Sequence, residues 1–174
     1  MQVIVADIDG TVLDVTERLA ACLREAGVEP GSDPSATLDT LKGKPRSRFY
    51  DSFQSVKYTH LDTPLPAVIG AIRTLHDETS LPVVYLSGRV ESMGKVTREA
   101  LSALDLPFEA VLLRPRSQLM RRTTEFKVAA LRDHGYEPVH AFDDDEAVLA
   151  AFGVAFPGVT LHPVGRRRHS PPAT

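Results

Sequence analysis

The stretch VIVADIDGT, residues 3 to 11, decides the fold of this 174-residue chain. Its first four residues are all apolar, which is typical of a strand buried on both faces of a parallel sheet. The run ends at once in Asp7 and Asp9, and Gly10 then permits a sharp turn of the backbone. The sequence therefore predicts a buried first strand that carries two carboxylates to one edge of a sheet.

Four more short apolar runs have the character of strands, and they lie at residues 82–86, 110–113, 139–142 and 159–161. Segments with apolar side chains at helical spacing alternate with the strands, at residues 19–26, 68–75, 96–104, 126–131 and 148–152. This alternation predicts the α/β class. We expect a Rossmann-like open parallel sheet of about five strands with helices on both faces.

Two segments depart from the alternation. Residues 29–63 combine proline, glycine and serine with basic and aromatic residues and show no long period, so we interpret them as a small cap-like insertion. Residues 165–174 contain three arginines and two prolines without an apolar face, which predicts a disordered basic tail. The expected organisation is one domain over residues 1–164, followed by that tail.

Composition narrows the possible classes of protein. The chain is 43% hydrophobic and 25% charged, and its single cysteine, Cys22, cannot form an internal disulfide. No apolar stretch approaches the roughly 18 residues of a membrane span, and no basic region precedes the first apolar run. We therefore expect a cytoplasmic protein without a membrane partner. A net charge of −3 gives no whole-molecule attraction for nucleic acid, and the oligomeric state stays open.

Polar side chains follow the predicted strands at the edge where open α/β sheets bind their ligands. They carry carboxylates and a hydroxyl: Asp7, Asp9, Ser87, Asp143 and Asp144. Lys127 adds an ammonium from early in the helix between the third and fourth strands. Because the carboxyl ends of parallel strands share one edge, we expect these side chains to converge on one crevice. Crowded carboxylates repel one another unless a cation lies between them, and an all-oxygen set of ligands suits Mg²⁺.

This combination of groups predicts phosphoryl chemistry. A carboxylate beside Mg²⁺ can attack phosphorus and form an acyl phosphate, while a second acid protonates the leaving oxygen. A lysine and a serine can hold the remaining phosphoryl oxygens. The sequence therefore predicts an enzyme that acts on a phosphorylated substrate.

The motif Asp7-x-Asp9-Gly10-Thr11-Val12, followed in order by Ser87, Lys127 and Asp143-Asp144, resembles the four motifs of the haloacid dehalogenase-like (HAD) phosphatases. The resemblance spans residues 1 to about 164 and implies a HAD-type sheet. It assigns Asp7 as the nucleophile and Asp9 as general acid and then base. Ser87 and Lys127 would bind the phosphoryl group, and Thr11 and Gly88 the substrate. Mg²⁺ would be held by Asp7, the Asp9 carbonyl, and Asp143 or Asp144.

A finer resemblance is to the phosphatase domain of polynucleotide kinase-phosphatases and its stand-alone relatives. It rests on Arg48-Phe49-Tyr50-Asp51, Ser87-Gly88-Arg89, Arg114-Pro115 and Phe142-Asp143-Asp144. It implies that Arg48, Arg89 and Arg114 line the substrate pocket, and that the substrate is a nucleotide or the 3′-phosphate end of a nucleic acid. One departure is Asp145, which stands where that group usually has arginine.

Three other functions compete with this interpretation. A phosphatase for a small non-nucleotide metabolite would use the same motifs, so it remains the alternative. A phosphate-binding domain without activity would not need both Asp7 and Asp9. A two-component receiver domain is phosphorylated on an aspartate after its third strand, whereas the paired acids here follow the first.

Overall fold

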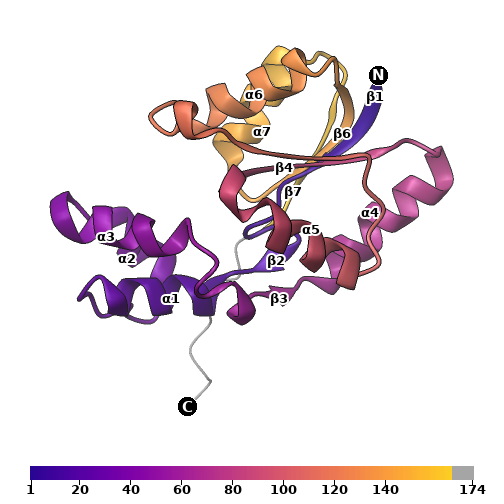
Figure 1. Cartoon of the computed structure of the whole chain (residues 1–174). Coiled ribbons are helices and arrows are strands. Elements are labelled where there is room, and N and C mark those ends of the chain that lie inside the picture. The colour runs from indigo at the N-terminus through magenta and orange to yellow at the C-terminus, as the bar shows by residue number, and fades with distance from the viewer. Residues whose placement is uncertain (166–174) are drawn as a thin grey trace.

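The computed structural model describes residues 1–165 and contains a sheet of five parallel strands (Figure 1). The strands are β1 (Gln2–Ala6), β4 (Val83–Val90), β5 (Ala110–Arg114), β6 (Glu137–Asp143) and β7 (Thr160–Pro163). The predicted α/β class and the five-stranded parallel sheet are therefore confirmed. The predicted disordered tail lies, from residue 166 onward, outside the described residues.

The order of the strands places β1 at the centre of the sheet. The sequence of neighbours is β5-β4-β1-β6-β7, so the chain builds outward from β1 to β5 and then crosses to the other side for β6 and β7. The strand order thus reverses beside β1. Ligands of open α/β sheets bind at the carboxyl ends of the strands around such a point, which is where Asp7 follows β1.

Alternate side chains of β1 enter two different cores, as the two-residue period of a strand requires. Val3 and Val5 pack with α6 (Thr123–Asp133) and α7 (Glu146–Ala155) on one face. Ile4 and Ala6 pack with α4 (Pro66–Thr79) and α5 (Gly94–Ala103) on the other. Helices therefore cover both faces, as predicted.

Three helices form a separate layer beside the carboxyl edge of the sheet (Figure 1). They are α1 (Thr16–Glu25), α2 (Pro34–Thr40) and α3 (Gly43–Phe53), and the 3₁₀ helix η1 (Thr59–Leu61) follows them. The antiparallel pair of β2 (Leu13–Asp14) and β3 (Thr63–Pro64) connects this helical insertion to the rest of the chain. Two more 3₁₀ helices, η2 (Glu91–Met93) and η3 (Arg116–Gln118), lie in connections outside it.

The helical insertion begins at Thr16, earlier than the boundary near residue 29 that we expected. Helix α1 packs chiefly against α3 and α2. Its apolar stripe, which includes Leu19, Cys22 and Leu23, is buried as the sequence indicated. An amphipathic pattern shows that one face of a helix is buried, but it does not reveal what covers that face.

Local signals explain where several helices begin. Asp33 accepts a hydrogen bond from the backbone N–H of Ala36, and Pro34 occupies the first turn of α2. In α7 the same role falls to Asp145, whose carboxylate accepts from the N–H of Ala147. Among residues 1–165, no helix is both long enough and apolar enough to cross a membrane.

Replacing Phe152 tests the core between α7 and the sheet. Phe152 is 1% exposed and belongs to the cluster around Val3, Val5 and Leu131. Phe152→Ala should lower the free energy of unfolding by about 3–5 kcal/mol in urea denaturation. Val154→Ala, two residues away and 85% exposed, should change it by less than about 0.5 kcal/mol. Equal losses in the two variants would contradict this packing.

Candidate active site

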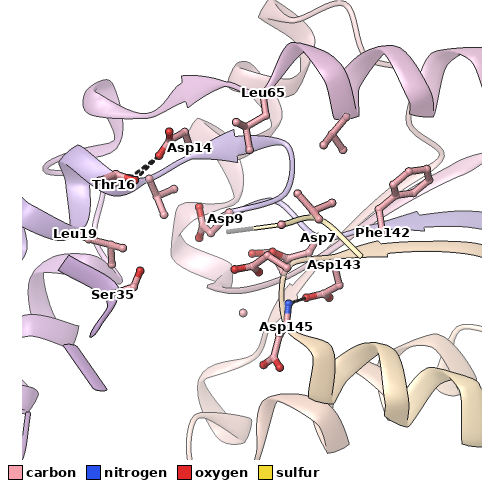
Figure 2. Close-up of a pocket in the computed structure, with 18 of the residues that line it drawn as sticks. Asp7, Asp9, Asp14, Thr16, Leu19, Ser35, Leu65, Phe142, Asp143 and Asp145 are labelled. Carbon is pink, nitrogen blue, oxygen red and sulfur yellow. Dashed lines mark hydrogen bonds between the residues drawn. The ribbon is translucent and has the colours of Figure 1, made fainter. Parts of the chain in front are cut away.

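A cavity of about 860 Å³ lies between the carboxyl edge of the sheet and the helical insertion (Figure 2). Seven of the residues that the sequence assigned to the site line it: Asp7, Asp9, Ser87, Gly88, Lys127, Asp143 and Asp144. They come from β4, α6 and β6 and from the loops that follow β1 and β6. The structure therefore brings together residues that are up to 137 positions apart in the chain.

Lys127 connects the ends of the two central strands. Its Nζ donates a hydrogen bond to Asp7 Oδ1 and another to Asp143 Oδ2, and both distances are 2.7 Å. All three side chains are almost fully buried. Because Phe126 and Leu131 anchor α6 in the core, the helix holds Lys127 over the edge of the sheet.

Asp7, Asp143 and Asp144 form a group of carboxylates that fits a divalent cation. Each offers one oxygen, and these oxygens all lie within 4.8 Å of one another. Burial raises the pKa of Asp7 well above its ordinary value, and the charges of Asp143 and Asp144 raise it further, although Lys127 opposes them. The single ammonium leaves an excess of negative charge, and an all-oxygen set of donors is what Mg²⁺ prefers. The Asp9 carbonyl as a further ligand stays a prediction.

Gly10 lets the loop after β1 pass directly beside Asp144. Its φ of +87° lies in the left-handed region, where glycine is favoured. A Cβ atom at this position would lie 2.7 Å from Asp144 Oδ2. The first motif therefore needs glycine both for its backbone conformation and for the space beside a candidate metal ligand.

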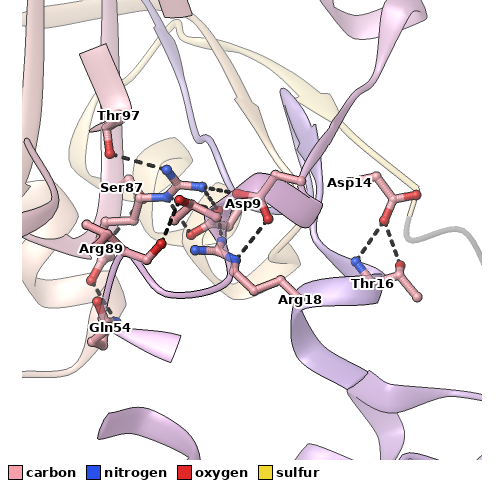
Figure 3. A network of polar contacts seen from close by, with 12 residues as sticks. Asp9, Asp14, Thr16, Arg18, Gln54, Ser87, Arg89 and Thr97 are labelled. Carbon is pink, nitrogen blue, oxygen red and sulfur yellow. Dashed lines mark hydrogen bonds and ion pairs between the residues drawn. The ribbon is translucent and has the colours of Figure 1, made fainter. Parts of the chain in front are cut away.

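Two arginines hold Asp9 (Figure 3). Arg89 donates from Nε to both carboxylate oxygens at 3.1 Å and from Nη2 to Oδ1 at 2.6 Å, and Arg18 pairs with the same Oδ1. Burial alone would raise the pKa of Asp9, but Arg89 and Arg18 lower it below its ordinary value. The ionised carboxylate is thus the stabilised form in this arrangement.

Asp62 completes a network of four charges across the junction of sheet and insertion. It forms ion pairs with Arg18 at 3.0 Å and with Arg89 at 2.8 Å. Arg18 and Asp62 belong to the insertion, whereas Arg89 and Asp9 belong to β4 and the loop after β1. Our reading of the sequence missed Arg18 and Asp62. The available signal was the position of Arg18, four residues before Cys22 and so in line with the apolar stripe of α1.

Four residues that the sequence assigned to substrate binding do not line the cavity. Thr11 is fully buried in the tight turn after β1, and Arg48 is exposed on α3. Arg89 is 2% exposed and engaged by Asp9, Asp62 and Thr97. Arg114 lies behind the cavity wall, where it donates to Thr123 Oγ1 at 2.9 Å and to the Arg121 carbonyl at 3.3 Å. The expected arginine-lined pocket is therefore not formed by these side chains.

The insertion supplies cavity residues that sequence reasoning did not assign. Leu19, Leu38, Tyr50 and Phe53 give it an apolar wall. Gln54 fixes the end of α3 to β4, because its amide donates to the Gly88 carbonyl at 3.3 Å and accepts from the Val90 N–H at 3.1 Å. The cavity is thus closed on one side by a wall held through backbone contacts.

Comparison with solved structures identifies the fold. A haloacid dehalogenase-like hydrolase from Streptococcus pneumoniae superposes with a TM-score of 0.64 at 15% identity, covering 95% of this chain and 87% of that one. The chain has the HAD-type hydrolase fold. A chain of the Pnkp1/Rnl/Hen1 complex gives the same TM-score at 14% identity over 94% of this chain, which spans 45% of that protein's length.

A HAD-family enzyme from Bacteroides thetaiotaomicron, solved as a magnesium complex, has a TM-score of 0.51 at 12% identity over 97% of this chain and 96% of that one. No known protein-family pattern matches the sequence, and no curated protein does either. The fold is thus shared with these hydrolases at low sequence identity.

A comparison with Gly27 separates the two constraints on Gly10, backbone conformation and the space beside Asp144. Gly27 also has a left-handed φ, of +79°, but a Cβ there would meet nothing within 4 Å. Gly27→Ala should therefore lower the free energy of unfolding by about 1 kcal/mol, the ordinary cost of this conformation. Gly10→Ala should cost more in urea denaturation, because Asp144 must also move. An equal cost in both variants would show that Asp144 has room to yield.

Proposed function

We propose that the chain is a magnesium-dependent phosphomonoesterase that forms an aspartyl-phosphate on Asp7. One observation carries the proposal: Lys127 donates hydrogen bonds to both Asp7 and Asp143. Asp144 lies beside this pair, and all four residues line the cavity. A nucleophile, a cation-binding set and a phosphoryl-binding ammonium are thus adjacent. The likeness to a HAD-family enzyme solved as a magnesium complex supports the choice of metal.

The first step would transfer the phosphoryl group to the enzyme. When bound by Asp7, Asp143 and Asp144, Mg²⁺ would offset the repulsion between a carboxylate and an anionic phosphoryl group. An oxygen of Asp7 forms a bond to phosphorus while the bond from phosphorus to the ester oxygen breaks. Lys127 and the Ser87 hydroxyl stabilise the charge on the other phosphoryl oxygens.

Asp9 would handle the protons of both steps. It gives a proton to the departing ester oxygen, and in the second step it takes one from the water that attacks phosphorus. The bond from phosphorus to Asp7 then breaks and releases phosphate. The pairs with Arg18 and Arg89 stabilise the ionised carboxylate, which is the form that the second step requires. Asp9 must therefore gain a proton against these two pairs before it can act in the first step.

Two substrate classes can be considered for this chemistry. The ends of nucleic acids or nucleotides with 3′-phosphates are supported by the likeness to a chain of the Pnkp1/Rnl/Hen1 RNA repair complex and by the sequence matches around Arg48, Arg89 and Arg114. A small non-nucleotide phosphate ester is supported by the positions of those three arginines outside the cavity. The second class agrees better with the geometry.

Hydrolysis of phenyl phosphate tests the proposed reaction. Activity should require Mg²⁺, disappear on treatment with EDTA and return when Mg²⁺ is restored, because Asp7 cannot approach a phosphoryl anion without a cation. Asp7→Asn keeps the shape of the side chain and should abolish turnover while the circular dichroism spectrum is preserved. Activity that survives either change would contradict an aspartyl-phosphate mechanism.

Lys127→Ala should reduce kcat by about 10²-fold or more, since one preorganised charge stabiliser is lost. Ser87→Ala should reduce kcat less, because a hydroxyl contributes no full charge. Lys95→Ala provides the matched control, since Lys95 is 89% exposed on α5, and it should leave kcat unchanged. Thermal melts of all three variants would separate loss of activity from loss of fold. Equal and negligible effects of the first two changes would place the phosphoryl group elsewhere.

A further inference from the structure

Beyond the carboxylates at the strand ends, the cavity walls are mostly apolar. The insertion contributes Leu19, Leu38, Tyr50 and Phe53, and the start of α4 contributes Leu65 and Val68. Phe53 is fixed by stacking on Phe49 at 5.3 Å and by the guanidinium of Arg18 at 4.3 Å from its ring. A group that leaves water against this wall gains free energy in proportion to its apolar area.

The charges that face the cavity are almost all negative. Outside the Asp7 cluster, the acidic residues Asp14, Asp39 and Asp145 also belong to its lining. Asp14 accepts hydrogen bonds from Thr16, and Asp145 accepts one from Ala147, and both contacts leave the negative charge in place. Among the described residues of the lining, Lys127 is the only lysine or arginine, and Asp7 and Asp143 already engage it. Even with Mg²⁺ bound, carboxylates outnumber cations among the described residues around the space that the rest of a substrate would occupy.

The apolar walls and the negative charge affect the binding of charged and uncharged esters in opposite ways. A nucleic-acid end brings further phosphates, which the surplus carboxylates would repel. Among residues 1–165, the three arginines assigned to the pocket by resemblance are exposed on α3, paired with Asp9 and Asp62, or turned to Thr123. An uncharged apolar group meets no such repulsion and can be buried against Leu38, Tyr50 and Phe53.

We propose, on the basis of the phosphomonoesterase function inferred above, that the substrate is the phosphate monoester of a small, uncharged and largely apolar alcohol or phenol. Only its phosphoryl group meets the charged floor of the cavity. Leu38, Tyr50 and Phe53 select the apolar body, and Asp14, Asp39 and Asp145 exclude polyanions.

A matched panel of esters tests this inference on the full chain with Mg²⁺. Phenyl phosphate and 4-tert-butylphenyl phosphate have similar leaving groups and differ in apolar area. The larger ester should have a kcat/KM about tenfold higher, mainly through a lower KM. A 3′-phosphorylated oligothymidylate should be hydrolysed more slowly than thymidine 3′-monophosphate. Its rate should rise with added salt, because salt screens repulsion.

Variants of the cavity wall should change these ratios. Tyr50→Ser should reduce the advantage of the tert-butyl ester, whereas Val56→Ser, at an exposed position outside the cavity, should preserve it. Asp39→Lys should raise kcat/KM for the oligonucleotide relative to that for phenyl phosphate. Asp51→Lys makes the same change of charge at an exposed position that does not line the cavity, and it should leave that ratio unchanged.

The possible failures are distinguishable. If phenyl phosphate is hydrolysed but the tert-butyl group confers no advantage, the inferred substrate class is wrong and the phosphomonoesterase stands. If the oligonucleotide has a higher kcat/KM than both aryl esters, and added salt lowers that value, the inference is overturned in favour of nucleic-acid ends. If no ester is hydrolysed in the presence of Mg²⁺, both the proposed function and this inference are wrong.

Discussion

The ammonium of Lys127, held between the carboxylates of Asp7 and Asp143, is the contact on which the rest of the site depends. An unpaired charge in such a buried place would cost several kcal/mol, about 3–5 kcal/mol when one partner of a buried pair is removed. The contact also fixes geometry, because Asp7 directly follows β1, Asp143 ends β6 and Lys127 lies in α6. Strands β1 and β6 are adjacent in the sheet, so strand order and charge pairing support the same arrangement.

Much of the fold could be predicted from the sequence because its strands are short apolar runs that end in polar residues. The convergence of Asp7, Ser87, Lys127 and Asp143 followed from the rule that parallel strands share a carboxyl edge. The extent of the insertion could not be predicted in the same way. The stripe on α1 is equally compatible with packing on a sheet or on other helices, and only the three-dimensional structure distinguishes the two.

The arginines show where local resemblance stops being informative. In α3, Phe49 and Phe53 are four residues apart and share the inner face, so Arg48 necessarily lies off it. The pairing of β4 with β5 shifts register between Leu86 and Val90, the stretch that contains Arg89. The Arg89 side chain contacts Asp9 and Asp62 and does not line the cavity. A helical wheel could have excluded Arg48, but no sequence rule predicts the shift in β4.

The Asp9 network spans the insertion and the sheet, and this has a consequence for the proposed reaction. Arg18 and Asp62 belong to the insertion and Arg89 to the sheet, while the two-residue strands β2 and β3 are the covalent link between the two parts. A displacement of the insertion would withdraw Arg18 and Asp62 from the network and leave Arg89 beside Asp9. If Asp9 carries the proton as proposed, the entry of a molecule to the cavity and the protonation of Asp9 would be coupled through these contacts.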